Sequence, residues 1–258
     1  MGNATQIWVD GVLDGQIPGD DPGLLFGLTV FETLRTYQGV PFRLERHIER
    51  LMASAAAMDI ALPSQSQIRR EILDVCAGDV SIRYTVTAAQ RTILQVRSLS
   101  GERPCQPKRV TPLEWVNPPS LPGAVKHGCR AAWLLAARKA DVDEVLLVDA
   151  SGDILEASRS NVFAVCDGRM MTPPLDGRQL AGVTREALFD AASSIGLAIE
   201  ETAISVSADF DEFYLASTLK ELSPVPALSR KGFNELGPLG KRLHDAFTAL
   251  VIRECGGR

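Results

Sequence analysis

Helical apolar stripes and short β-hairpins are interspersed along this chain in no regular β-α-β order, and this mixture is the feature that most constrains its fold. Apolar side chains recur at helical spacing over residues 44–58 and again over 239–251. β-Branched and aromatic segments meet across tight turns, as in residues 161–172, where Asp167-Gly168 is a favoured two-residue hairpin turn. Doubly wound sheets need strict alternation of strand and helix, so this order predicts an α+β fold built from two units.

A proline-rich segment with little periodicity lies near the middle of the chain. Its six prolines are Pro104, Pro107, Pro112, Pro118, Pro119 and Pro122. Because proline clusters mark turns and loops, this segment is the candidate connection between the two units. We predict an N-terminal α+β domain over residues 1–112, a connection over 113–122 and a C-terminal domain over 123–258.

The composition excludes several classes of protein. A chain of 258 residues with 45% hydrophobic content has enough apolar side chains for a large core. The net charge of −5 argues against a general nucleic-acid-binding surface, and no apolar run reaches the roughly 18 residues that a membrane span needs. The first residues lack the basic and apolar regions of a signal peptide. We therefore expect a cytoplasmic protein that binds neither nucleic acid nor membranes.

Neither the five cysteines nor the three histidines show the spacing of a metal site or a disulfide framework. The odd number of cysteines and the absence of close pairs indicate reduced thiols, as in cytosolic proteins. We therefore expect no bound metal ion.

Lys126 is one of only six lysines, against twenty-one arginines, and it precedes a helix predicted over residues 129–139. Glu156 follows thirty residues later on a predicted hairpin. Taken alone, an amine before a helix and a carboxylate on a hairpin are typical of solvated surface side chains. Whether Lys126 and Glu156 have a functional role depends on what the other segments of the chain indicate.

Arg50 lies in the sequence His47-Ile48-Glu49-Arg50-Leu51, within the first predicted helix. On the helical wheel Arg50 falls nearly opposite Ile48, so periodicity alone predicts that it faces solvent.

Two later segments are suited to an anion. Gly182 precedes a predicted helix that starts near Val183 and Thr184, and a helix start offers unpaired N–H groups and the positive end of the helix dipole. Thr218 can add a hydroxyl donor. A plain turn before a helix is the alternative interpretation of Gly182.

In this order and spacing, the segments resemble the class IV aminotransferases, which are pyridoxal-phosphate enzymes. The resemblance extends over roughly residues 23 to 228. Its parts are residues 23–35, the His47-x-x-Arg50-Leu51 motif, Lys126, Glu156, and residues 182–185 and 216–225. It implies a homodimer of two-domain chains, each with a small α/β N-terminal domain and a larger pseudo-barrel C-terminal domain.

The resemblance also implies the role of each residue. Lys126 is the catalytic residue: it holds pyridoxal phosphate covalently and then moves the substrate proton. Glu156 faces the ring nitrogen of the cofactor and keeps it protonated. The phosphate is bound by Arg50, Val183, Thr184 and Thr218.

The substrate pocket departs from the branches of the family. Phe31-Glu32-Thr33 resembles the lyase or D-amino-acid branch, and Ala131 replaces a tyrosine typical of branched-chain enzymes. Phe31, however, lacks the tyrosine hydroxyl with which the D-amino-acid branch binds the substrate carboxylate. Another cation is therefore needed, and the available arginines are Arg35, Arg83, Arg91, Arg130, Arg159 and Arg178. Arg91 and Arg178 are the candidates we favour, with a surface role as the alternative for both.

We expect an aminotransferase that moves an amino group between a D-amino acid and a 2-oxo acid. The alternatives are an aminodeoxychorismate lyase, which forms 4-aminobenzoate and pyruvate, and a branched-chain amino-acid aminotransferase. A cofactor-binding protein with little turnover is a third hypothesis, which the altered pocket motivates.

Overall fold

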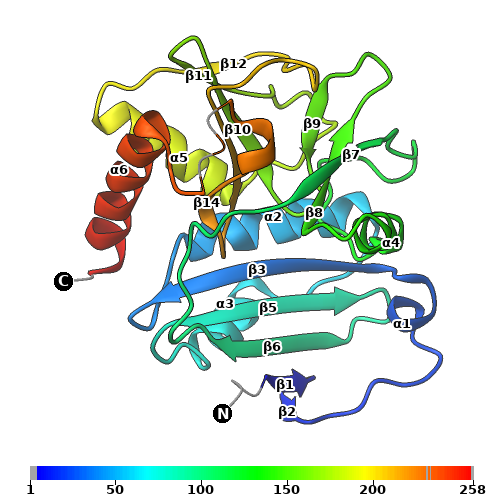
Figure 1. Cartoon of the computed structure of the whole chain (residues 1–258). Helices are drawn as coiled ribbons and strands as arrows, with labels where there is room; N and C mark the ends of the chain where they lie inside the picture. The colour runs from blue at the N-terminus through cyan, green and yellow to red at the C-terminus, as the bar shows by residue number, and fades with distance from the viewer. Residues whose placement is uncertain (1–4, 231, 233, 257–258) are drawn as a thin grey trace. The chain divides into compact units, whose positions relative to one another are not determined.

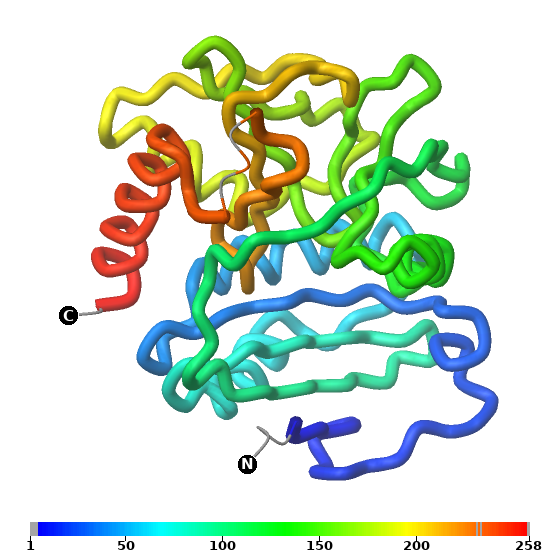
Figure 2. Tube along the Cα trace, viewed as in Figure 1, coloured from blue at the N-terminus to red at the C-terminus, as the bar shows by residue number. Residues whose placement is uncertain are grey.

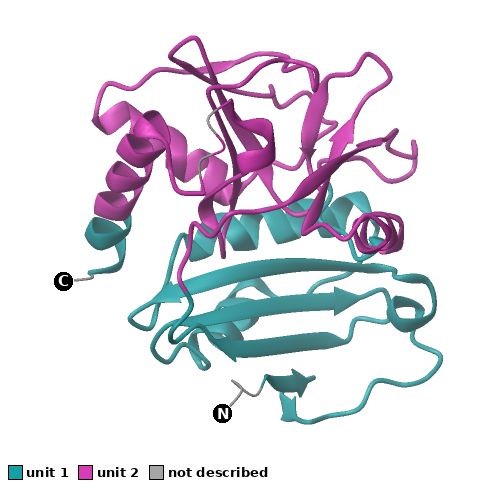
Figure 3. Ribbon diagram, in the orientation of Figure 1, with its two compact units in different colours: residues 1–102, 125–130, 251–258 teal, residues 103–124, 131–250 magenta. Residues whose placement is uncertain are grey.

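The computed structural model describes residues 5–230, 232 and 234–256 and divides the chain into two compact units (Figure 3). Unit 1 comprises residues 1–102, 125–130 and 251–258, and unit 2 comprises residues 103–124 and 131–250. Among the described residues, no helix has the length and hydropathy to span a membrane.

These units divide the chain differently from the predicted domains over 1–112 and 123–258. Residues 110–114 form a strand that pairs with residues 144–148, so the chain joins unit 2 soon after residue 102. Residues 125–130 instead pair with a strand of unit 1. Both differences arise from strand pairing between distant segments, which composition does not reveal.

Unit 1 is built on a six-stranded antiparallel sheet of order β2-β1-β6-β5-β3-β4 (Figure 1). Its strands are β1 (Gln6–Val9), β2 (Val12–Leu13), β3 (Thr29–Tyr37), β4 (Val40–Pro41), β5 (Val80–Thr87) and β6 (Thr92–Ser98). Its helices are α1 (Pro22–Phe26), α2 (Leu44–Ala57) and α3 (Gln65–Leu73).

One face of this sheet carries the core of unit 1. Val30 and Leu34 of β3 pack with the apolar stripes of α2 and α3, which include Ile48 and Ile68. Side chains alternate across a strand, so Phe31, between these core positions, projects from the opposite face. This alternation gives β3 two chemically different sides.

Unit 2 contains a five-stranded sheet of order β12-β11-β10-β13-β14 and a three-stranded sheet of order β7-β8-β9 (Figure 1). The strands are β7 (Val110–Glu114), β8 (Glu144–Val148), β9 (Ile154–Ala157), β10 (Asn161–Cys166), β11 (Arg169–Thr172), β12 (Ile199–Glu201), β13 (Glu212–Ser217) and β14 (Glu221–Pro224). The helices are α4 (Ala131–Lys139), α5 (Val183–Ser194), the 3-10 helix η1 (Pro226–Leu228) and α6 (Pro238–Cys255), most of which belongs to unit 2.

Hairpins dominate unit 2, as the sequence predicted. The turn between β10 and β11 contains Asp167 at φ 50° and Gly168 at φ 72°, the left-handed pair that a tight hairpin requires. Among the pairs of named strands in the described residues, only β7–β8 and β11–β12 are parallel, so the mixed sheets confirm the α+β class. The trace of the whole chain is drawn in Figure 2.

Candidate functional site

The predicted site residues fall in both units, and each unit is described separately. Unit 1 contains Phe31, Arg50, Arg91 and Lys126, and unit 2 contains Glu156, Arg178, Val183, Thr184 and Thr218.

The backbone of Lys126 is fixed between a helix and the edge of a strand. Its N–H donates to Ser54 Oγ of α2 at 3.0 Å, and its carbonyl accepts from the N–H of Phe31 in β3 at 3.1 Å. Along the same edge, the N–H of Gly128 donates a hydrogen bond to the carbonyl of Thr29 at 2.9 Å. A Cβ on Gly128 would lie 2.1 Å from Thr29 Oγ1, so only glycine allows the lysine segment to approach β3 this closely.

Three cationic side chains gather on the ring of Phe31. The distances to its centroid are 5.0 Å from Lys126 Nζ, 3.5 Å from Arg83 Cζ and 4.9 Å from Arg130 Cζ. Arg83 reaches Phe31 because it lies opposite Thr33 in the β3–β5 register, diagonally next to Phe31 on one face. Stacking of guanidinium on the ring contributes about 0.5–2 kcal/mol for each cation. We name Phe31, Arg83, Lys126 and Arg130 the cationic cluster.

The cationic cluster brings three basic side chains to one aromatic ring. Among the described residues, no carboxylate lies within ion-pair distance of Arg83. Burial, and then the charge of Arg130, lower the pKa of Arg83 to about 10, and the guanidinium stays protonated at neutral pH. The same two causes lower the pKa of the neighbouring His127 to about 4, so that its ring is neutral. A partly buried guanidinium such as that of Arg83 is suited to binding an anionic ligand.

Arg50 lies in a buried network on the other side of β3. Its Nε and Nη2 each donate to Glu32 at 2.7 Å, and His47 Nδ1 lies 2.8 Å from the same carboxylate. Burial opposes ionisation of Glu32, but the charge and hydrogen bonds of Arg50, and then of His47, hold its pKa well below the usual range. Burial also lowers the pKa of His47, and the charges of Arg50 and Lys126 act in the same direction against the effect of Glu32.

The solvent-facing position predicted for Arg50 from helical periodicity is therefore wrong. Only 11% of the Arg50 side chain is exposed. The cause is Glu32, a carboxylate on the core face of β3, which needs a charged partner on α2. The bidentate pair fixes the plane of the Arg50 guanidinium.

Replacing Glu32 by glutamine is expected to lower the free energy of unfolding by about 3 kcal/mol at neutral pH, because Arg50 is left buried without its counter-charge. The folded-state pKa of Glu32 is depressed. The contribution of ionised Glu32 to the free energy of unfolding is therefore complete above the unfolded carboxyl pKa of about 4.3. It is lost as the pH falls toward the pKa of Glu32 in the folded state. Urea unfolding of the wild type and the variant between neutral and acidic pH measures this difference in stability.

Glu45→Gln, which removes an exposed ion pair with Arg69, serves as the control and should lower the free energy of unfolding by under about 1 kcal/mol. Equal losses for the two variants would contradict the assignment.

Glu156 belongs to a hydrogen-bonded network in unit 2. Glu156 is 8% exposed, and its Oε2 accepts from Leu180 N at 3.3 Å and from Asn161 Nδ2 at 3.4 Å. Asn161 Nδ2 also donates to the Leu180 carbonyl at 2.9 Å. The network therefore ties Glu156 to the loop that leads into α5.

The start of α5 has the features of a phosphate site. Gly182 is its N-cap, and no described side chain caps the helix. Val183 and Thr184 are buried, so their N–H groups lie in a sheltered place at the positive end of the helix dipole. A Cβ on Gly182 would lie 1.9 Å from Asn161 Oδ1, which makes glycine necessary here. These residues fit a phosphate dianion.

Thr218 follows β13, in the turn to β14. In the β10–β13 register Asn161 lies opposite Ala216, so this turn lies beside the start of β10. Lys220 occupies the same turn, but its Nζ pairs with buried Glu144 at 2.7 Å. Lys220 is therefore neutralised within unit 2 and has a structural role.

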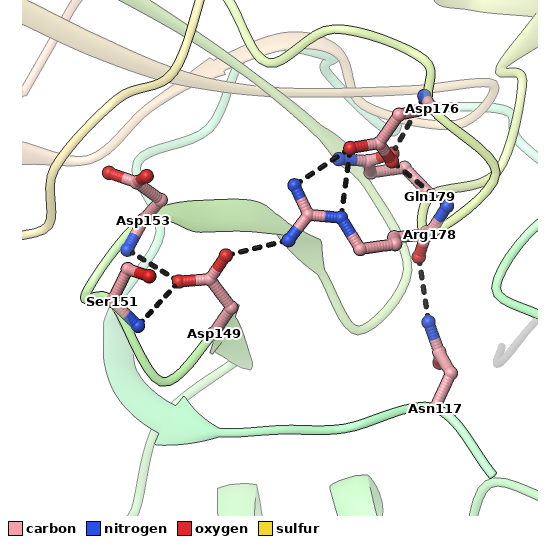
Figure 4. Close-up of polar contacts among 7 residues, drawn as sticks. All are labelled: Asn117, Asp149, Ser151, Asp153, Asp176, Arg178 and Gln179. Atoms are coloured by element: carbon pink, nitrogen blue, oxygen red, sulfur yellow. Dashed lines mark hydrogen bonds and ion pairs between the residues drawn. The ribbon is translucent and has the colours of Figure 1, made fainter.

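The two arginines favoured for the substrate carboxylate are both engaged in ion pairs. Arg91 pairs with Asp10 at 2.8 Å, and its side chain is 44% exposed. Arg178 pairs with Asp176 at 2.7 Å and with Asp149 at 2.6 Å (Figure 4). Hydrogen bonds to Asp176, and then to Asp149, raise the pKa of Arg178 further. Its backbone carbonyl accepts from Asn117, so Arg178 holds the loop before α5 in place.

Sequence reasoning included Arg83 and Arg130 among six available arginines but did not favour them. A signal for Arg83 was present in residues 80–87, where it alternates with the apolar positions Ile82 and Tyr84. That pattern places Arg83 on the face opposite the core, but its proximity to Phe31 depends on the strand register.

The chain is similar to several known proteins. A model of the family described as amino-transferase class IV matches residues 29–228. A D-alanine aminotransferase of Listeria innocua is 27% identical over 278 residues, which cover 94% of this chain and 93% of that protein. A probable branched-chain-amino-acid aminotransferase of Thermotoga maritima is 30% identical over 235 residues, 86% of each chain. The crystal structure of a putative branched-chain amino acid aminotransferase from Thermotoga maritima covers 96% of this chain and 96% of its own, with a TM-score of 0.82 and 28% identity.

Proposed function

Because the chain belongs to the class IV aminotransferase family, whose members use pyridoxal phosphate, we propose that it transfers an amino group between a D-amino acid and a 2-oxo acid. The observation that carries the proposal is the cationic cluster, in which an amine and two guanidinium groups share one aromatic ring. An amine beside a binding site for a carboxylate is what an amino acid needs in order to react.

Pyridoxal phosphate, when bound, supplies an aldehyde that links to amines and a protonated ring that withdraws electrons from the α-carbon of the substrate. The amine of Lys126 would hold the cofactor and would move the proton at the α-carbon of the substrate. The carboxylate of Glu156 holds the proton on the ring nitrogen. The N–H groups of Val183 and Thr184, the hydroxyl of Thr218 and the guanidinium of Arg50 would donate to the phosphate.

The substrate carboxylate binds to Arg83 and Arg130, in place of the predicted Arg91 and Arg178. Arg83 supports this assignment best, because a half-buried guanidinium next to a second cation gains most from an added anion. Phe31 fixes the guanidinium planes and contacts the apolar part of the substrate. The name of the Listeria relative and the sequence Phe31-Glu32-Thr33 favour the D-series.

A panel of amino donors tests the function. We expect D-alanine or D-glutamate to convert the cofactor to its amine form and to release the matching 2-oxo acid. Conversion by L-leucine and L-isoleucine alone would identify a branched-chain enzyme instead. Pyruvate formed from aminodeoxychorismate without net amine transfer would identify a lyase, and a cofactor that responds to no donor would identify a binding protein.

Replacing Arg83 by alanine is expected to raise the KM for D-alanine about 10- to 100-fold, because hydrogen bonds to a charged group contribute about 1.5–3 kcal/mol each. The half-reaction with 1-phenylethylamine, which has no carboxylate, should change less than about 2-fold if the wild type accepts it. Steady-state kinetics and single-turnover spectra provide these values. Arg91→Ala is the matched control, and a larger effect of that variant on KM would contradict the assignment.

We propose that the protein is a homodimer. In unit 1, α1 exposes Leu24, Leu25 and Phe26 by 62%, 55% and 69%, a cluster of apolar side chains that a second copy can cover. Light scattering should give twice the chain mass of 27.9 kDa. Phe26→Asp should shift the population toward the monomer, whereas Leu73→Asp, at an exposed position on α3, should not. A monomeric wild type would refute the proposal.

A further inference from the structure

Three potential metal ligands from distant segments meet in unit 2. His244 Nε2 of α6 lies 3.2 Å from Cys105 Sγ and 2.7 Å from Glu221 Oε2. All three donor atoms lie within 4.8 Å of one another. Cys105 and His244 are 139 residues apart in the chain, which explains why no metal cluster was predicted from spacing.

The geometry distinguishes between two uses of such a group. In a nucleophilic triad the histidine contacts the nucleophile through one ring nitrogen and the acid through the other. Here the thiol and the carboxylate both face the same nitrogen, Nε2 of His244. The sulfur, nitrogen and oxygen donors lie within 4.8 Å of one another, close enough to share one metal ion.

The backbone holds these donors together independently of any ion. Cys105 N–H donates to the carbonyl of Lys220 at 3.1 Å, which places the thiol next to the residue before Glu221. Glu221 begins β14 and pairs with Ser217 in the strand register. The side chains of Glu221 and His244 are only 8% and 18% exposed, so the donors are sheltered but not sealed from water.

We propose that Cys105, Glu221 and His244 bind a zinc ion, with water as the fourth ligand. Thiolate and imidazole donors favour zinc over magnesium or calcium. Ligand bonds of about 2.0–2.3 Å to zinc place the donor atoms of a tetrahedral site roughly 3.3–3.8 Å apart. The present separations of 2.7 and 3.2 Å need to open by less than about 1 Å to reach this geometry.

A zinc ion here has a structural consequence. It cross-links residue 105, the first residue of β14 and helix α6, which lie in three separate segments of unit 2. The turn that leads into β14 carries Thr218, one of the proposed phosphate ligands. The ion therefore stabilises the folded state of unit 2, whether or not the donor panel supports the proposed reaction.

The test uses the full-length protein with its cofactor, treated with a chelator and then titrated with zinc chloride. We expect one equivalent of zinc to be retained after desalting and to raise the Tm, because a ligand that binds the folded state stabilises it. Cys105→Ser and His244→Gln should each weaken zinc binding at least 10-fold. Cys166→Ser, which changes another half-buried cysteine of unit 2, should leave it unchanged. Equal zinc binding by the Cys105→Ser/His244→Gln double variant would overturn the proposal.

A second measurement applies to the wild type even if the variants do not fold. Zinc should slow alkylation of Cys105 by iodoacetamide at least 10-fold, read by peptide mass spectrometry. The exposed Cys129 is the internal control and should react at an unchanged rate. Alkylation of both cysteines at rates independent of zinc would contradict the site.

Discussion

Lys126→Ala is expected to lower kcat/KM for amino transfer by at least about 10³-fold, because it removes both the covalent attachment of the cofactor and the general base, whose role alone is worth about 10²–10⁴-fold. Borohydride reduction of the wild type should trap the cofactor on the peptide that contains Lys126, and the variant should show no trapped cofactor. Stopped-flow kinetics with the best donor of the panel and peptide mass spectrometry measure these two effects.

The control for this prediction is Lys139→Ala, which removes an exposed amine at the end of α4 and should retain full activity. Circular dichroism should show that both variants are folded. Cofactor trapped on another lysine, or a loss of activity below about 10-fold, would refute the role of Lys126.

Glu156→Gln is expected to lower kcat about 100-fold while the cofactor stays attached to Lys126. Loss of one charged partner from a buried pair costs about 2–5 kcal/mol, and about 2.7 kcal/mol corresponds to a factor of 100. Glutamine keeps the shape of the side chain and can still accept from Leu180, so the loss reports the charge on the carboxylate. Rapid-quench measurement of the first turnover separates this effect from binding.

Glu156→Asp retains the charge and should recover part of the activity. Glu114→Gln, at an exposed position of β7, is the control and should behave as the wild type. If the Glu156→Gln variant turned over at the wild-type rate, this carboxylate would not act on the ring nitrogen.

The sequence was sufficient to predict the α+β class and the family, because hairpin turns, apolar stripes and short motifs are local properties. Asp167-Gly168 formed the predicted turn because its left-handed backbone requirement is local. The family match over residues 29–228 includes the stretch from His47 to Thr218, from which the family was predicted.

Features that depend on long-range pairing could not be predicted in this way. Arg50 is buried because Glu32 lies opposite it on a neighbouring strand, a contact that the helical wheel does not contain. Arg83 could not be separated from the other arginines without the register that places it diagonally from Phe31. The unit boundaries depend on the pairing of β7 with β8, which joins residues more than thirty positions apart.

The side-chain amide of Asn161 limits which substitutions this protein can accept. Asn161 contacts Glu156 through its nitrogen, and its oxygen faces Gly182 at the start of α5. A substitution there would alter, in the same step, the carboxylate proposed to face the ring nitrogen and the helix start proposed to bind the phosphate. Under the proposed roles, a change of Asn161 that alters reactivity would also weaken cofactor binding, whereas changes of the arginines around Phe31 would alter substrate binding alone.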